Sequence, residues 1–353
     1  MFTEKYAEPL FIITDDTGMI QHSNFTVPDP KSGYTTDDNA RALMAAVMLY
    51  ERYRSEKYLE LIFRYLSFLT YAQNKDGGFK NFMDYNRNFI EENGSEDCFG
   101  RCLWCLGCVI NSPYIKNTIK YAALTLVKNS IQNVYKLNHI RGKSYSLIGL
   151  CIIYKSVCEN SSILNYFNLN NKLDEIKNLI INLSDDILHD FKKCSSEKWQ
   201  WFEDELTYSN SIIPLSLLKG YETTKKDNYL NTALKSIDFL NGIYFKNDYF
   251  KPIGCKGWFK IGANSPAEFD EQPVEACSTA FLYLEAYKVT NKNFYLRKAH
   301  LCSEWFTGNN SIGKSMLDNL THGCYDGIRK SDINLNTGAE SILANIITQL
   351  LVS

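Results

Sequence analysis

The sequence predicts an all-α fold of the (α/α)6 toroid type, in which six helical hairpins close into a ring. Two observations predict it. A polar loop runs directly into an apolar helix about every sixty residues, and a second series of helices with one polar face lies between these loops. Similarity at a fixed period along a whole chain is typical of repeat architectures. Closing the ring buries the flank that each unit would otherwise expose.

The loop-led series forms the inner helices of the predicted ring. Its two clearest members share the pattern Asp-x-x-small-Arg-small-Leu and run from Asp37 to Leu43 and from Asp97 to Leu103. Weaker relatives open helices near Ser144, Ser209, Gln272 and Gly338. The segments that follow are apolar on nearly every side, at residues 42–50, 103–110, 147–154, 212–218 and 276–284. A helix that is apolar all round is buried on every side, so these helices are expected to line the centre.

The second series forms the outer helices. Apolar residues recur at i, i+3, i+4 and i+7 in two segments, at residues 58–69 and 230–240. A Tyr marks most members of the series, at Tyr58, Tyr114, Tyr229 and Tyr295, with a degenerate copy around Leu173. Strand is expected at most at Leu10–Ile13 and in short loop hairpins.

Length and composition indicate one domain inside the cell. The chain has 353 residues, and no linker rich in Pro, Gly or Ser interrupts the repeat, so residues 1–353 are expected to form one domain with residues 1–36 as a lead-in segment. The net charge of −2 disfavours nucleic acid or an anionic membrane as partner. Neither a secretory signal nor a membrane span is found. Eleven cysteines, an odd number with several at core positions, favour a reducing cytoplasm.

One cysteine spacing suggests a different chemistry. Cys98-x3-Cys102-x2-Cys105 matches the iron–sulfur motif of radical S-adenosylmethionine enzymes. These cysteines fall on one face of a predicted helix, however, which favours small buried side chains. The five histidines are scattered and form no i, i+4 pair. The sequence therefore predicts no metal site and no cofactor.

The candidate active site lies at one end of the predicted ring. The loops that enter the inner helices converge there, and they are rich in carboxylates and aromatic rings. The candidate catalytic carboxylates are Asp38, Asp97, Asp204, Asp270, Glu275 and Glu340, which are expected to line one cavity. The candidate substrate-binding residues are Tyr34, Asp37, Arg41, Glu96, Arg101, Trp201, Tyr208, Asn210, Gln272 and Tyr325. Glycosidic cleavage needs one protonated and one ionised carboxyl group, and sugar rings stack on aromatic side chains.

Several of these residues also have a purely structural explanation. Asp37, Asp38 and Asp97 stand where a helix cap or a first-turn acid is favoured. Asp37 with Arg41, and Asp97 with Arg101, are spaced as i, i+4 salt bridges. A charged pair on a buried helix is costly unless it lines a wet cavity or is fully hydrogen-bonded, which tilts both pairs toward a site. Glu275 and Glu340 are lone carboxylates among small and apolar residues, where burial raises a pKa as a general acid requires.

Five runs of the chain resemble a known group of proteins: Gly33 to Leu43, Trp201 to Asp204, Tyr208 to Asn210, Gln272 to Ala276 and Asn336 to Ser341. They are similar to an incompletely characterised group of six-hairpin, glycosidase-like proteins, often encoded beside or fused to glycosyltransferases or mannoside-processing enzymes. The resemblance extends from about Thr14 to Leu350. It implies the (α/α)6 fold and a carbohydrate-related role, and it supplies no catalytic pair.

The expected function is therefore a carbohydrate-active enzyme, foremost a glycoside hydrolase that acts on an oligosaccharide, with a mannoside as one candidate. A first alternative is a module that binds a glycan or associates with a glycosyltransferase without catalysis. A second is a terpenoid-cyclase-like toroid. The run Gln73 to Phe79 approaches the Gln-x3-Gly-x-Trp repeat of those proteins, but it occurs once and ends in Phe. Thr35 also replaces the first acid of their Asp-x-Asp-Asp motif.

Overall fold

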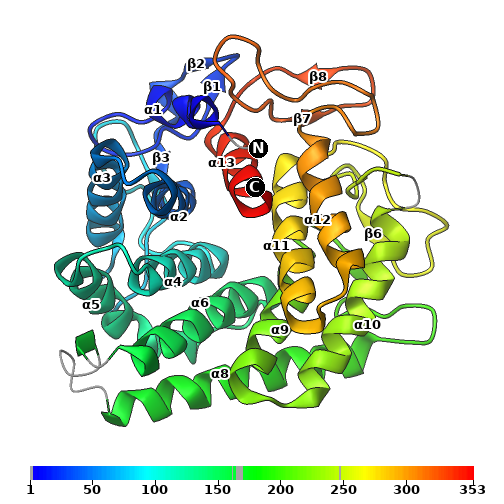
Figure 1. Ribbon diagram of the computed structural model, residues 1–353, viewed down its shortest axis with the longest axis horizontal. Coiled ribbons are helices and arrows are strands. Elements are labelled where there is room, and N and C mark those ends of the chain that lie inside the picture. The colour runs from blue at the N-terminus through cyan, green and yellow to red at the C-terminus, as the bar shows by residue number, and fades with distance from the viewer. Residues whose placement is uncertain (1–2, 161, 164–169, 246–247) are drawn as a thin grey trace.

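The computed structural model describes residues 3–160, 162–163, 170–245 and 248–353 and confirms the predicted fold class. Helices form a ring around a central core (Figure 1). The inner helices are α2 (Thr36–Tyr53), α4 (Glu96–Asn111), α6 (Ile140–Glu159), α9 (Ile212–Thr224), α11 (Pro273–Thr290) and α13 (Ala339–Val352). The outer helices are α3 (Glu56–Ala72), α5 (Asn117–Val134), α8 (Asn170–Cys194), α10 (Asp227–Tyr244) and α12 (Asn293–Trp305).

The inner helices contact one another around the full circle. Each packs on the next in chain order from α2 to α13, and α13 packs back on α2. Each outer helix packs on the inner helix of its own hairpin. Because a returning outer helix follows each of the first five inner helices, the inner helices run parallel. Their N-terminal ends therefore meet at one end of the ring.

The lead-in segment differs from its prediction. The strand expected at Leu10–Ile13 is wrong, because Glu8–Ile12 forms the short helix α1, which follows a 3-10 helix at Glu4–Ala7. Pro9 occupies the first turn of α1, where its fixed φ and missing N–H are tolerated. Helix α1 contacts α13, so the first and last parts of the described chain meet.

The burial pattern explains why the two helix series differ. On α3, Tyr58, Ile62 and Tyr65 are fully buried, whereas Phe63 on the opposite side is exposed. On α11, by contrast, the buried residues lie on every side of its first half. In the second series, Tyr58, Tyr229 and Tyr295 are buried. Tyr114 is exposed because it lies before α5 begins.

Helices α4 and α6 approach each other closely through glycines. A Cβ added at Gly100 would lie 2.6 Å from the Cβ of Tyr145, and one added at Gly149 would lie 2.6 Å from the backbone of Leu103. Such distances leave no room for a side chain, so glycine is needed for this contact. The close approach places Arg101, the residue after Gly100, beside Tyr145.

Among the described residues, the loops contain four short pairs of antiparallel β-strands. They pair β1 (Ser23–Asn24) with β2 (Val27–Pro28), β3 (Tyr34–Thr35) with β4 (Phe82–Met83), β5 (Glu205–Leu206) with β6 (Phe259–Lys260), and β7 (Gly327–Ile328) with β8 (Ile333–Asn334). A further 3-10 turn spans Pro30–Ser32. These ladders stabilise the loops that lead into the inner helices. Among the described residues, no helix combines the length and the apolar character needed to cross a membrane.

Candidate active site

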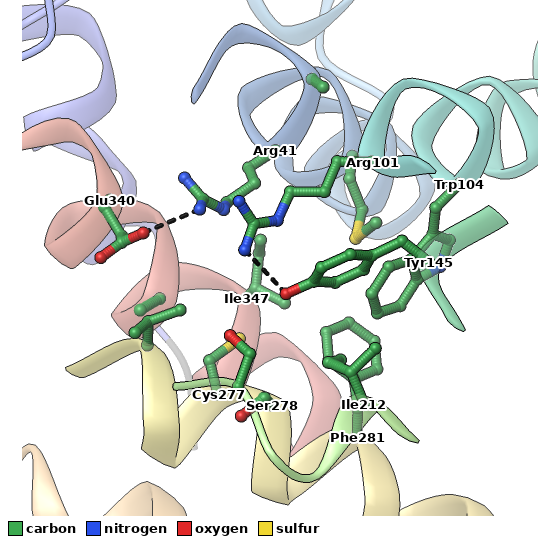
Figure 2. A pocket seen from close by; sticks show the side chains of 15 residues that line it. Arg41, Arg101, Trp104, Tyr145, Ile212, Cys277, Ser278, Phe281, Glu340 and Ile347 are labelled. Carbon is green, nitrogen blue, oxygen red and sulfur yellow. Dashed lines mark hydrogen bonds and ion pairs between the residues drawn. The ribbon is translucent and has the colours of Figure 1, made fainter. Parts of the chain in front are cut away.

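A cluster of charged side chains lies where α2, α4 and α13 begin. Arg41 of α2 donates to Asp38 Oδ1 at 2.6 Å and to Asp37 Oδ2 at 3.0 Å. It also reaches across to α13 and donates to Glu340 Oε2 at 2.7 Å (Figure 2). Arg101 of α4 donates to the same Oδ2 of Asp37 at 2.6 Å. Two arginines from two helices therefore share one carboxylate.

The pairing of Arg101 joins two helices where the sequence suggested a bond within one. Its second guanidinium nitrogen donates to the Tyr145 hydroxyl of α6 at 2.7 Å, as Figure 2 shows. Asp97, one turn before Arg101 on α4, instead accepts a hydrogen bond from the Tyr208 hydroxyl at 2.9 Å. The network therefore runs from α13 through α2 and α4 to α6.

A second cluster surrounds Arg141, which the sequence analysis did not select. Arg141 is buried and makes a bidentate ion pair with Glu203, at 3.1 and 2.9 Å to its two oxygens. Its Nε donates to the backbone carbonyl of Tyr208 at 2.6 Å, and its Nη2 donates to Asn210 Oδ1 at 3.2 Å. Arg141 thus fixes the turn that contains Ser209.

All three arginines stand within the first six residues of their inner helices. The N-terminal end of a helix carries a partial positive charge and disfavours cations. The arginines are nevertheless buried or nearly so. Their position is therefore explained by the surrounding carboxylates and not by helix stability.

The two neighbouring aspartates of α2 titrate differently. Burial acts to raise the pKa of Asp37, but the positive charges of Arg101 and Arg41 outweigh it, and the pKa is lowered. Burial raises the pKa of Asp38 to about 6, against the opposing charge of Arg41. The first structural explanation also applies here, because Asp37 and Asp38 lie in the first turn of α2 after the cap Thr35.

Glu275 is a buried carboxylate without a cation in hydrogen-bond contact. It lies in the first turn of α11 and is 2% exposed. Its Oε1 accepts from the backbone N–H of Ser209 at 2.5 Å, while its Oε2 is buried and has no hydrogen-bond partner among the described residues. Burial raises the pKa of Glu275 to about 7. A carboxyl group with this pKa is protonated in a substantial fraction of molecules at neutral pH.

A cavity of about 50 Å³ opens beside these groups. Figure 2 shows Arg41, Arg101 and Glu340 on one side and apolar side chains on the other. The apolar wall consists mainly of Met44, Trp104, Ile212, Val274, Phe281, Ala344 and Ile347. Ser209, the partner of Glu275, also lines the cavity, and its hydroxyl is buried without a hydrogen-bond partner among the described residues. Buried polar atoms of this kind call for water or a ligand.

The structure brings four of the six candidate carboxylates to this region. Glu340 lines the cavity, and Glu275 touches Ser209 in its wall. Asp38 belongs to the Arg41 cluster, and Asp97 contacts Tyr208. The other two lie elsewhere: Asp204 is exposed, and Asp270 forms an ion pair with Lys256 at 3.1 Å.

The candidate binding residues divide in the same way. Asp37, Arg41, Arg101, Tyr208 and Asn210 belong to the two charged clusters. The remaining five have structural contacts. The Tyr34 hydroxyl donates to Asp15, Glu96 accepts from the backbone N–H groups of residues 138 and 139, Gln272 is the N-cap residue of α11, and the Tyr325 hydroxyl donates to Asp318. Trp201 is fully buried against Phe202.

Trp104, not Trp201, is the tryptophan of the cavity wall. It packs against Phe281 with 4.9 Å between the ring centroids. A tryptophan inside an apolar helix has the appearance of a core residue, so composition alone did not select it. Its spacing is the available signal, since it follows Arg101 by three residues and so lies on the same side of α4.

The remaining sequence motifs have structural places. Cys98, Cys102 and Cys105 are fully buried within α4, and all eleven cysteines are unbridged. Among the described residues, no group of His, Cys, Asp and Glu side chains is arranged to hold a metal ion. The Gln73 to Phe79 loop ties α3 to α5, because Gln73 donates to the Leu126 carbonyl at 2.9 Å.

No protein-family model matches the sequence, and no curated protein matches it. Solved structures do match. The cellobiose 2-epimerase from Bacillus thermoamylovorans is similar with a TM-score of 0.72 and 12% identity, over 98% of both chains. A GH76 alpha-mannanase from Bacteroides thetaiotaomicron gives 0.66 and 10%, over 99% of this chain and 94% of that one. An inactive alpha-1,6-mannanase variant from Salegentibacter, in complex with alpha-1,6-mannotetrose, gives 0.65 and 11%, over 99% and 96%. The chain shares the fold of these enzymes.

Proposed function

We propose that this protein is a carbohydrate-active enzyme, and specifically a glycoside hydrolase that cleaves an oligosaccharide. The observation that carries the proposal is Glu275, a buried carboxyl group whose pKa is raised to about 7 beside the cavity. A general acid for glycosidic cleavage needs a raised pKa, so that it still holds its proton at neutral pH.

Glu340 supplies the second carboxylate in this proposal. It lines the cavity, its side chain is 41% exposed, and Arg41 pairs with it at 2.7 Å. In the proposed reaction, Glu275 donates its proton to the oxygen that leaves as the glycosidic bond breaks. Glu340 accepts a proton from the water that forms the new bond to the anomeric carbon. The pair corresponds to the acid and base of a hydrolysing carboxylate pair.

The solved structures support a carbohydrate substrate. Two of the proteins that share this fold are named as mannanases, and one of them holds alpha-1,6-mannotetrose. A mannoside is therefore the first substrate to test. No cofactor is needed for the proposed steps. Association with a glycosyltransferase rests on the sequence resemblance alone and stays a prediction, as do cytoplasmic location and the single domain over residues 1–353.

The test is a hydrolysis assay with three matched glutamine variants. Wild type is incubated with manno- and cello-oligosaccharides, and new reducing ends are measured. Glu275→Gln and Glu340→Gln should each lower turnover by roughly 10²–10⁴-fold, since each removes one proton-transfer step. Glu271→Gln is the control. Glu271 is also buried and also precedes the apolar part of α11. Its carboxylate accepts from Trp305 at 3.0 Å, a residue outside the cavity wall, whereas Glu275 accepts from Ser209, which lines the cavity.

The same assay decides between the enzyme and a binding module. Release of reducing ends that depends on Glu275 and not on Glu271 supports hydrolysis. If wild type binds a sugar in a titration but neither releases reducing ends nor epimerises the sugar, the protein is a non-catalytic glycan-binding module.

A second candidate is sugar epimerisation, because the same fold carries a cellobiose 2-epimerase and a sugar epimerase at TM-scores of 0.72 and 0.70. A carboxylate with a pKa of about 7 can also act as a base that removes a proton next to a carbonyl. Incubation in D2O separates the two reactions. Epimerisation incorporates deuterium at C2 of a reducing sugar and creates no new reducing ends. Hydrolysis creates new reducing ends and incorporates no deuterium at C2.

A further inference from the structure

A second concave surface lies among the loops that precede α2 and α13. It is an open groove of about 560 Å³, in the size range of small-molecule sites, which is roughly 300–1,000 Å³. The β1–β2 turn forms one side and the β7–β8 hairpin the other, and Figure 1 shows these hairpins close together at the top of the ring. The side chains that the argument uses are Phe25, Arg329, Asp332, Asn334, Leu335 and Asn336.

The backbone of Phe25 is fixed by hydrogen bonds, and its side chain is exposed to solvent. Its backbone N–H donates to Asn336 Oδ1 at 3.0 Å, and its carbonyl accepts from the N–H of Thr337 at 2.9 Å. Phe25 also has a φ of +54°, which is unfavourable for a bulky side chain. These hydrogen bonds fix the backbone in that conformation, while 65% of the residue is exposed. An aromatic ring in a fixed position beside a groove offers an apolar platform.

The polar part of the groove carries little net charge, since its charged lining residues are Lys314, Arg329 and Asp332. The Arg329 guanidinium pairs with the Asp332 carboxylate at 2.7 Å, so the opposite charges of these two side chains cancel. Two asparagines, Asn334 and Asn336, add amide groups that can donate and accept hydrogen bonds. An aromatic platform beside amides and a paired arginine suits a ligand with apolar C–H faces and many hydroxyl groups. It suits a nucleic acid or an acidic peptide less well, because a strong positive field is missing.

The groove is also close to Glu340 along the chain. Asn336 lies four residues before Glu340. Four residues span at most about 14 Å even when fully extended, so the edge of the groove and the start of α13 are within reach of a short oligosaccharide.

We propose that this groove binds the distal sugar units of the oligosaccharide whose bond lies at the cavity. Phe25 stacks on one sugar ring, and Asn334, Asn336 and Arg329 bind hydroxyl groups of the same chain. The choice of an oligosaccharide as ligand rests on the proposed function. The groove would make longer chains better ligands than short ones.

The experiment measures binding separately from cleavage. Manno- and cello-oligosaccharide ladders, from disaccharide to hexasaccharide, are titrated calorimetrically into the Glu275→Gln protein, with and without Phe25→Asn. Asparagine tolerates a positive φ better than most residues, so this change removes the ring and leaves the backbone. Phe25→Tyr should restore binding. Phe63→Asn is the matched control, because Phe63 is 54% exposed on the outer helix α3 and is not one of the residues that line this groove.

The expected result is tighter binding with chain length, and a loss of about tenfold for the hexasaccharide in Phe25→Asn, from the apolar contact removed. Disaccharide binding should be unchanged, and Phe63→Asn should bind like its parent. Equal affinity for all lengths, an equal loss from Phe25→Asn at every length, or no binding of either ladder would overturn the inference. Length-dependent binding that needs Phe25, in a wild-type protein that cleaves nothing, would support the groove and reject hydrolysis.

Discussion

Two buried glutamates on α11 have pKa values that are shifted in opposite directions. Glu275 and Glu285 are ten residues apart and are 2% and 4% exposed. Glu285 has Lys219 Nζ at 2.6 Å from its Oε1, an ion pair that lacks hydrogen-bond geometry, and Lys288 Nζ at 3.4 Å from its Oε2. Glu275 has a backbone N–H on one oxygen and no hydrogen-bond partner among the described residues on the other.

The difference in partners sets the difference in pKa. Burial acts to raise the pKa of Glu285, but the charge of Lys219 outweighs it, and the pKa is lowered. Burial dominates at Glu275 and raises its pKa to about 7. Equal burial therefore produces a structural ion pair toward one end of the helix and, at the other, a carboxyl group with a raised pKa, which the proposed function uses as its proton donor. The neighbouring cation, not the depth, decides the role.

The largest expected effect on stability comes from removing the charge of Glu285. Glu285→Gln should lower the free energy of unfolding by at most about 3–5 kcal/mol, because Lys219 then keeps a largely buried charge with only the partly exposed Glu222, at 2.9 Å, as its partner. Chemical denaturation at neutral pH measures it. Activity per folded molecule should stay close to wild type. A stable Glu285→Gln protein with strongly reduced turnover would reverse the roles assigned to the two glutamates.

The pH dependence of stability should have opposite signs for the two sites. The folded-state pKa of Glu275 lies above its usual value near 4.5, so the folded state binds the extra proton, and stability falls as the pH rises from about 4.5 to 7. Glu275→Gln removes this loss, and should be more stable than wild type at pH 8 by at most ~3 kcal/mol.

This gain should vanish toward pH 4. The pKa of Glu285 is lowered in the folded state, so this group adds stability at pH values above its pKa in the unfolded chain. That stability is lost as the pH falls through the folded-state pKa. Denaturation curves from pH 8 down to acid pH well below 4.5, the usual glutamate pKa, check both signs. An advantage of Glu275→Gln that is the same at every pH would show that titration of Glu275 is not its source.

A smaller effect is expected from Arg141, which positions the turn that holds Glu275. Arg141→Met removes a positive charge that lowers the pKa of Glu275, so that pKa should rise further. Because a general acid must be protonated, the alkaline limb of kcat/KM should move to higher pH while the maximum falls about tenfold. Arg141→Lys keeps the charge but not the bidentate contact with Glu203. Arg141→Lys should leave the alkaline limb of kcat/KM at its wild-type pH and lower only the maximum of kcat/KM.

The smallest effect should come from Tyr208→Phe. It removes one hydrogen bond, from the Tyr208 hydroxyl to Asp97 at 2.9 Å. Tyr208 is 40% exposed, so water can replace the lost partner, and the expected cost in stability is about 1 kcal/mol or less. A loss well above about 1 kcal/mol, measured by chemical denaturation at neutral pH, would show that Asp97 depends on Tyr208 more than the geometry indicates.

The sequence predicted the helices well because the periodicity of apolar residues indicates which faces of a helix are buried. The apolar segment 276–284 lies inside α11, and the amphipathic segment 58–69 lies inside α3. The strand expected at Leu10–Ile13 failed for the same reason. A short apolar run has no readable period, and the Pro9 start signal of α1 lies just before it.

Contacts between helices could not be predicted in this way. The Asp37–Arg41 pair follows from i, i+4 spacing, but the partner of Arg101 is 64 residues away and depends on how closely α4 meets its neighbours. Arg141 was missed because Leu137, not an acid, stands four residues before it. Its ion-pair partner Glu203 comes from a loop instead.

The central claim is that Glu275 holds a proton at neutral pH, and a site-specific titration tests it most directly. The carboxyl signal of Glu275 can be followed by 13C NMR of Glu-labelled protein across the pH range and assigned by its absence in Glu275→Gln. The account predicts a midpoint close to pH 7, as burial raises the pKa of this group to about 7. A midpoint at or below the usual value near 4.5 would contradict the role of Glu275 as the acid.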